Sequence, residues 1–75
     1  MVKNIWELND ESAVDLFVKA LRKGDKLTRS FAAELLGEIG DERAITPLKI
    51  AMEDNEEIVR VYAEKSLEKI TKKIA

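Results

Sequence analysis

The feature that most constrains this chain is an internal repeat of 31 residues. When the sequence is shifted by 31 positions, residues 10–40 align with residues 41–71 without a gap. Two copies of one short unit indicate a repeat architecture, in which each unit buries its apolar side against its neighbour. Eight positions are identical: Asp10/Asp41, Glu11/Glu42, Ala13/Ala44, Ala20/Ala51, Arg29/Arg60, Ala32/Ala63, Leu36/Leu67 and Ile39/Ile70.

Apolar spacing predicts two helices in each unit. In the first unit, Asp10 is a candidate N-cap for a helix that runs to about Lys23, and a second helix is predicted over 26–39. Its apolar stripe contains Thr28, Ala32, Leu35, Leu36 and Ile39.

The second unit repeats this plan with one irregularity. Gly40 stands where a left-handed residue ends a helix, and Asp41 where the next N-cap belongs. Helices are then predicted over 42–53 and 56–73, with a turn at residues 54–55. Pro47 interrupts the first of these helices, so we expect either a kink or a short turn before it.

Composition excludes much enzyme chemistry. The chain has 75 residues, which is one small domain, and it contains no cysteine and no histidine. Thiol nucleophiles, disulfides, imidazole bases and the usual zinc sites are therefore impossible. Acidic residues cluster at the predicted helix starts, where capping explains them. We expect no catalysis, no cofactor and no metal. With four aromatic residues, the core must consist mostly of Leu, Ile, Val and Ala.

Charge argues against nucleic acid and membranes as partners. Thirteen Lys and Arg oppose fifteen Asp and Glu, whereas nucleic-acid modules carry a basic excess. The lysines near the C-terminus are an alternative anion site, but cations there also complement the helix dipole.

Charges interrupt every apolar stretch and no signal peptide is visible, so we expect a cytoplasmic protein. The Lys-, Glu- and Ile-rich composition is similar to thermophile usage.

The segment Thr28–Leu48 resembles the HEAT-like repeat named after phycobilisome lyases. That pattern reads V-R-x-x-A-A-x-A-L-G-x-I-G-D-x-R-A-x-x-P-L, and this chain departs from it only at Thr28 and Leu35. The resemblance implies an all-α fold: a short right-handed α-solenoid of two helical hairpins, four main helices in all. It also implies that the second helix of each hairpin lines a concave, protein-binding side.

We expect a single domain over residues 1–75, with repeat one at 10–40 and repeat two at 41–75. Repeat two has Glu68 where repeat one has Gly37, which is typical of a terminal repeat with a polar outer face. Residues 1–9 are predicted to cap the other end near Leu16, although Trp6 could instead anchor a partner. Because two repeats bury little core, a homodimer is a further possibility.

The predicted concave surface has candidate partner-binding residues on both second helices. Two repeat-equivalent pairs have alternative interpretations. Arg29 and Arg60 are either a structural ladder that binds neighbouring turns or a basic pair for an anion. Phe31 and Tyr62 either face a partner or pack between the repeats. The candidate surface residues are Ser30, Phe31, Glu34, Glu38, Val61, Tyr62, Lys65 and Lys69.

The sequence therefore predicts a small protein-interaction scaffold whose partner it does not identify. By analogy with the family, an accessory subunit of a lyase is the alternative. A purely structural homo-oligomer is another.

Overall fold

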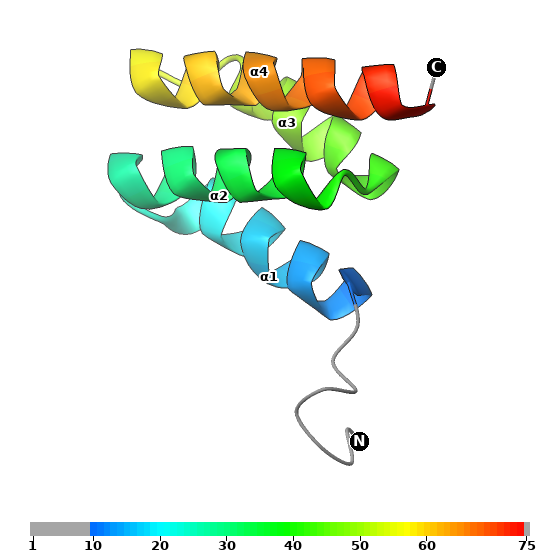
Figure 1. Ribbon diagram of the computed structural model, residues 1–75. Helices are drawn as coiled ribbons and strands as arrows, with labels where there is room; N and C mark the ends of the chain where they lie inside the picture. The colour runs from blue at the N-terminus through cyan, green and yellow to red at the C-terminus, as the bar shows by residue number, and fades with distance from the viewer. Residues whose placement is uncertain (1–9, 75) are drawn as a thin grey trace.

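The computed structural model describes residues 10–74 and contains four α-helices in that range (Figure 1). The first hairpin consists of α1 (Asp10–Lys23) and α2 (Lys26–Ile39). A 3-10 turn, η2 (Glu42–Ala44), leads into α3 (Ile45–Ala51), and α4 (Glu57–Ile74) completes the second hairpin. The prediction of an all-α pair of helical hairpins is confirmed.

In Figure 1 the second helices, α2 (green) and α4 (yellow to red), lie side by side and run in the same direction, with α1 and α3 behind them. Equivalent residues of the two repeats therefore lie next to each other. None of the helices in the described residues is long and apolar enough to cross a bilayer. The predicted capping segment, residues 1–9, lies outside the described range.

The ends of α2 follow the capping residues that the sequence supplies. Asp25 is the N-cap, and its side chain accepts a hydrogen bond of 2.8 Å from the Thr28 amide. Gly40 ends the helix with φ at 74°, a left-handed conformation that glycine adopts without steric cost, and its N–H donates to the Leu36 carbonyl. The predicted boundaries of α2 are confirmed.

The helix predicted over 42–53 is shorter and irregular at its start. Asp41 caps the 3-10 turn η2, where its side chain accepts from the Arg43 amide, and α3 then runs only to Ala51. Pro47 is the third residue of α3, so its missing N–H falls among the first-turn amides that lack an intrahelical acceptor. Of the two alternatives for Pro47, the short preceding turn is confirmed.

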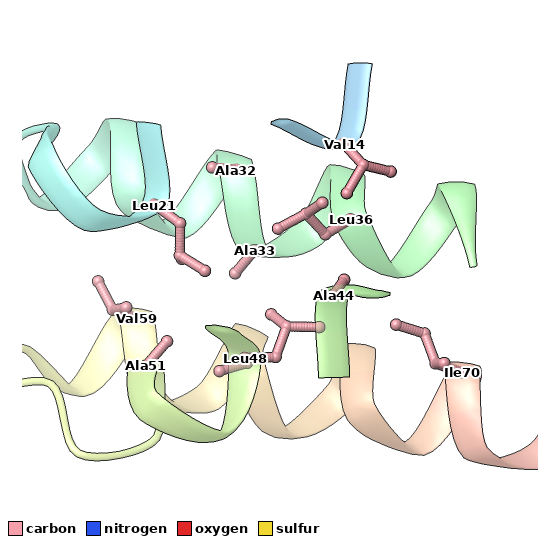
Figure 2. Packing of buried hydrophobic residues seen from close by; sticks show 11 residues of the cluster. Val14, Leu21, Ala32, Ala33, Leu36, Ala44, Leu48, Ala51, Val59 and Ile70 are labelled. Carbon is pink, nitrogen blue, oxygen red and sulfur yellow. The ribbon is translucent and has the colours of Figure 1, made fainter. Parts of the chain in front are cut away.

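The core lies between the two hairpins and consists entirely of aliphatic residues (Figure 2). Figure 2 shows Leu36 and Ala33 of α2 directed toward Leu48 of α3. No aromatic side chain is fully buried in the described residues, as the composition predicts. The largest fully buried side chains are Val14, Leu36, Leu48, Val59 and Ile70.

The buried side of α2 is rotated away from the predicted stripe. Leu35 is 42% exposed, whereas Ala33 and Gly37 are buried. The reason is that α2 has two neighbours, α1 on one side and α4 on the other, so its buried arc is centred between them. Glycine does not count as an apolar residue on a helical wheel, so Gly37 was left out of the predicted apolar stripe. The centre of that stripe was therefore placed too close to Leu35.

Candidate functional site

The exposed surface of α2 and α4, which we call the second-helix face, contains most of the predicted partner-binding residues. Four residues come from each helix, and each residue on α2 has its repeat equivalent on α4. Because the helices are parallel and adjacent, the eight side chains form one continuous surface. They are Leu27, Phe31, Glu34 and Glu38 of α2, with Ile58, Tyr62, Lys65 and Lys69 of α4.

The first half of this face is apolar. Phe31 is 61% exposed and Leu27 is 55% exposed, and Ile58 is also exposed. Tyr62 is half-buried and packs against the core. The inter-repeat packing alternative is therefore wrong for Phe31, whose side chain points outward, whereas Tyr62 fits it in part.

The second half of the face is charged and carries opposite signs on its two helices. Glu38 of α2 accepts a hydrogen bond from Lys69 of α4, and this contact lowers the pKa of Glu38 below its usual 4.5. Both side chains are exposed, so the pair contributes little to stability. The Lys65 ammonium lies 5.9 Å from the centre of the Tyr62 ring.

A groove of about 240 Å³ follows the boundary between the two helices in this charged half. Its walls come from both repeats, with acid on one side and base on the other. The lining residues are Glu34, Tyr62, Lys65, Ser66 and Lys69.

Two of the predicted surface residues lie elsewhere. Ser30 is only 3% exposed, because α4 packs over it, and its hydroxyl donates to the Leu27 carbonyl at 2.8 Å. Its repeat equivalent Val61 is partly exposed on the far side of α4, where the described chain places no further helix. The prediction of Ser30 as a partner-facing residue is therefore wrong, since one repeat position has different neighbours in an inner and an outer helix.

Sequence reasoning missed Leu27 and Ile58. A signal for them exists, because each precedes the aromatic residue of its helix by four positions and the two are repeat equivalents. Their match in the repeat alignment is equally typical of core positions, so it does not by itself mark them as surface residues.

Arg29 connects the two hairpins. Its Nε donates to Asp54 Oδ2 at 2.9 Å, one terminal nitrogen donates to Oδ1 at 3.0 Å, and the other donates to the Gly24 carbonyl at 2.8 Å. Both side chains of the Arg29–Asp54 pair are largely buried, at 18% and 14% exposure. The hydrogen bond from Arg29 holds the pKa of Asp54 below its usual 3.8.

Arg60 binds the same turn from the second repeat. Its guanidinium donates to the backbone carbonyl of Asp54 at 2.6 Å, while its side chain stays exposed. The two repeat-equivalent arginines thus meet at one turn. These contacts use three of the five N–H donors of Arg29, one from each of its nitrogens.

A family model for HEAT repeats matches residues 1–68 of this chain. The chain belongs to the HEAT-repeat family. A comparison with curated proteins finds none that matches. The family match is to HEAT repeats in general and does not extend to the phycobilisome-lyase type.

The HEAT-repeat chain has a second groove on the opposite side, between its first helices α1 and α3. This groove measures about 390 Å³, and Ile50 at its rim is 65% exposed. The residues that line this groove are Val18, Arg22, Thr46, Pro47 and Ile50.

No group of three or more acidic side chains in the described residues is arranged to hold a metal ion.

Proposed function

We propose that this HEAT-repeat protein is a protein-interaction module that binds its partner through the second-helix face. The observation that carries the proposal is the apolar half of that face. Leu27, Phe31 and Ile58 are exposed next to one another on two adjacent helices, beside the half-buried ring of Tyr62. Exposed apolar side chains that gather in this way are typical of protein-binding surfaces.

The charged half suits a role in specificity. The acidic row on α2 and the basic row on α4 present charges of both signs to a partner. Charges at the rim of an interface determine the orientation of the bound partner more than they increase its affinity. HEAT repeats generally act as protein-binding scaffolds, which agrees with this assignment. The role needs no catalytic group. The finer resemblance to phycobilisome-lyase repeats rests on the Thr28–Leu48 motif alone.

The groove between α1 and α3 is the competing surface. It contains a single strongly exposed aliphatic side chain, Ile50, whereas the second-helix face contains three exposed apolar side chains together. We therefore place the partner on α2 and α4.

The experiment uses two photo-crosslinking positions with matched exposure. Benzoylphenylalanine replaces Leu27 in one protein and Ile50 in the other, and both are irradiated in extract of the source cells. We expect a specific adduct from position 27 only. The partner, identified by mass spectrometry and purified, is then titrated with Leu27→Ser and Ile50→Ser.

Truncating an anchor side chain costs more than about 1 kcal/mol, so Leu27→Ser should weaken binding at least about fivefold. Ile50→Ser should bind as the wild type does. Equal adducts from both positions, or unchanged affinity of Leu27→Ser, would overturn the assignment of this face.

A further inference from the structure

Two repeat-equivalent pairs of opposite charge stand on either side of the boundary between α2 and α4, and only one of them is joined. Glu38 accepts a hydrogen bond from Lys69, so both charges of this pair have a partner within the protein. Glu34 and Lys65 form the other pair, on opposite walls of the groove. Among the described residues, neither of these side chains takes part in a hydrogen bond or an ion pair. An exposed acid and an exposed base therefore remain unpaired beside one groove.

The Lys65 side chain is directed toward the apolar half of the face. Its ammonium lies 5.9 Å from the centre of the Tyr62 ring, which attracts a cation through its π electrons. This contact leaves N–H donors of the ammonium for a carboxylate, because an ammonium carries three of them. Lys65 is therefore available to an acidic group, and Glu34 to a basic one.

The groove suits the side chains of a macromolecule better than a whole small molecule. Its volume of about 240 Å³ is below the roughly 300–1,000 Å³ of the pockets that enclose small ligands. A ligand with charges of one sign would be repelled by one wall, because one wall is acidic and the other is basic. The chemistry of the groove therefore matches a partner that brings one positive and one negative side chain.

The backbone of the two helices indicates the conformation of that partner. In the middle of α2 and α4 the N–H and C=O groups bond within each helix, and the Ser66 hydroxyl donates to the Ala33 carbonyl at 2.6 Å. The described residues at the groove therefore offer an incoming chain no free backbone group. An extended segment would lose water from its own backbone without replacing those hydrogen bonds, whereas a helix satisfies them internally.

The length of the second-helix face fits about three turns of such a helix. Leu27 and Glu38, its first and last residues on α2, lie about 17 Å apart along the axis at about 1.5 Å per residue. Consecutive residues of a helix are about 100° apart, so two neighbours can lie on opposite sides of the line of contact. One adjacent acid and base on the partner can therefore reach Lys65 and Glu34 together.

We propose that the partner presents an amphipathic α-helix that lies along the boundary between α2 and α4; this inference rests on the function proposed above. Apolar side chains at one end of the helix cover Leu27, Phe31 and Ile58. Two adjacent residues of opposite charge follow along the helix, the basic one paired with Glu34 and the acidic one with Lys65.

The test uses a displayed library of random peptides of about 16 residues, which is long enough for the three turns that the face contacts. The library is selected against the full chain. We expect enriched peptides with apolar residues three or four positions apart at one end and an adjacent acid and base at the other. A synthetic copy of an enriched peptide should gain helical circular dichroism when it binds.

A charge exchange then tests the pairing. Glu34→Lys combined with Lys65→Glu places like charges opposite the peptide and should weaken binding about tenfold. Exchanging the acid and the base of the peptide should restore the affinity for this variant. The matched control is Lys49→Glu combined with Glu53→Lys, the same exchange at exposed positions on α3 and the turn after it, which should leave binding unchanged.

The outcomes separate this inference from the choice of face. Peptides that bind in an extended form, a library that yields no binder, or an affinity that ignores the exchange at Glu34 and Lys65 would overturn the helix and its charge pair. If Leu27→Ser still weakened binding in the last case, the second-helix face would stand. Binding that is lost with Ile50→Ser and kept with Leu27→Ser would overturn the face itself, and the helix with it.

Discussion

Gly37 of α2 and Ser66 of α4 lie so close that no side chain fits at position 37. A β-carbon added there would stand 2.3 Å from the Ser66 hydroxyl oxygen and 2.9 Å from the Ser66 α-carbon. The same hydroxyl donates a 2.6 Å hydrogen bond to the Ala33 carbonyl. This contact sets the spacing of the two second helices, and with it the width of the second-helix face.

Gly37→Ala should destabilise the protein although alanine is the better helix former. The gain in helix propensity is about 1 kcal/mol, whereas forcing α2 and α4 apart should cost about 3 kcal/mol, so the net loss of stability should be about 2 kcal/mol. Urea unfolding followed by circular dichroism measures the difference. Glu68→Ala, at the equivalent exposed position, should not destabilise.

A second substitution sharpens this prediction. Ser66→Gly removes the β-carbon and hydroxyl that collide with the methyl group added by Gly37→Ala, so the double variant should recover part of the lost stability. A Gly37→Ala protein as stable as the wild type would show that the helices are farther apart than described.

Leu48→Ala should be among the most damaging substitutions in α3. The side chain is fully buried at the centre of the aliphatic core, and replacing it with alanine leaves a cavity that costs about 2–5 kcal/mol. Ile50→Ala, two residues away and 65% exposed, should cost well under half as much. Thermal unfolding of both variants checks the prediction, and similar losses would contradict the burial of Leu48.

Asp54→Ala should weaken the connection between the hairpins. It removes the two hydrogen bonds from Arg29 and the bond from the Glu56 amide, a loss of about 1–3 kcal/mol for contacts to a charged group. Arg29→Ala should also destabilise, and more than Arg60→Ala, because Arg60 binds only the carbonyl of Asp54 and is exposed. Chemical denaturation of the three variants measures these losses, and equal effects of the two arginine substitutions would contradict the difference.

Stability should fall in acid and stay level near neutrality. The hydrogen bond from the Arg43 side chain lowers the pKa of Asp41 to about 2, and Arg29 lowers that of Asp54 below 3.8. A carboxyl with a depressed folded-state pKa binds protons first in the unfolded chain. Its contribution is therefore complete above 3.8 and is lost as the pH falls toward the folded-state value.

The unfolding temperature should accordingly be flat between about pH 5 and 8, because the chain has no histidine to titrate there. It should then drop between about pH 4 and 2. Asp41→Asn should reduce the size of that drop. A transition temperature that changes near about pH 6.5, the usual histidine range, would show that another group controls stability.

Much of this architecture followed from local sequence signals. Asp25 and Gly40 act through hydrogen bonds and backbone conformation within a few residues, so the ends of α2 could be placed without the rest of the fold. The repeat fixed the number of hairpins, and the shortage of aromatic residues fixed an aliphatic core. Pro47 left two alternatives because a kink and a preceding turn both satisfy a residue without an N–H.

The tertiary structure decided which residues face outward. Ser30 and Val61 share one repeat position, yet Ser30 is buried because α4 covers it and Val61 lies on an outer helix. Leu35 and Ser66 differ in the opposite sense, because Ser66 is buried against α2 whereas Leu35 of α2 is exposed. The periodicity of one helix identifies an apolar side, but burial depends on how many neighbours the helix has and from which directions they pack. The sequence by itself determined the helices, their pairing and the composition of the core. Only the packing of α4 on α2 decided which residues form the second-helix face.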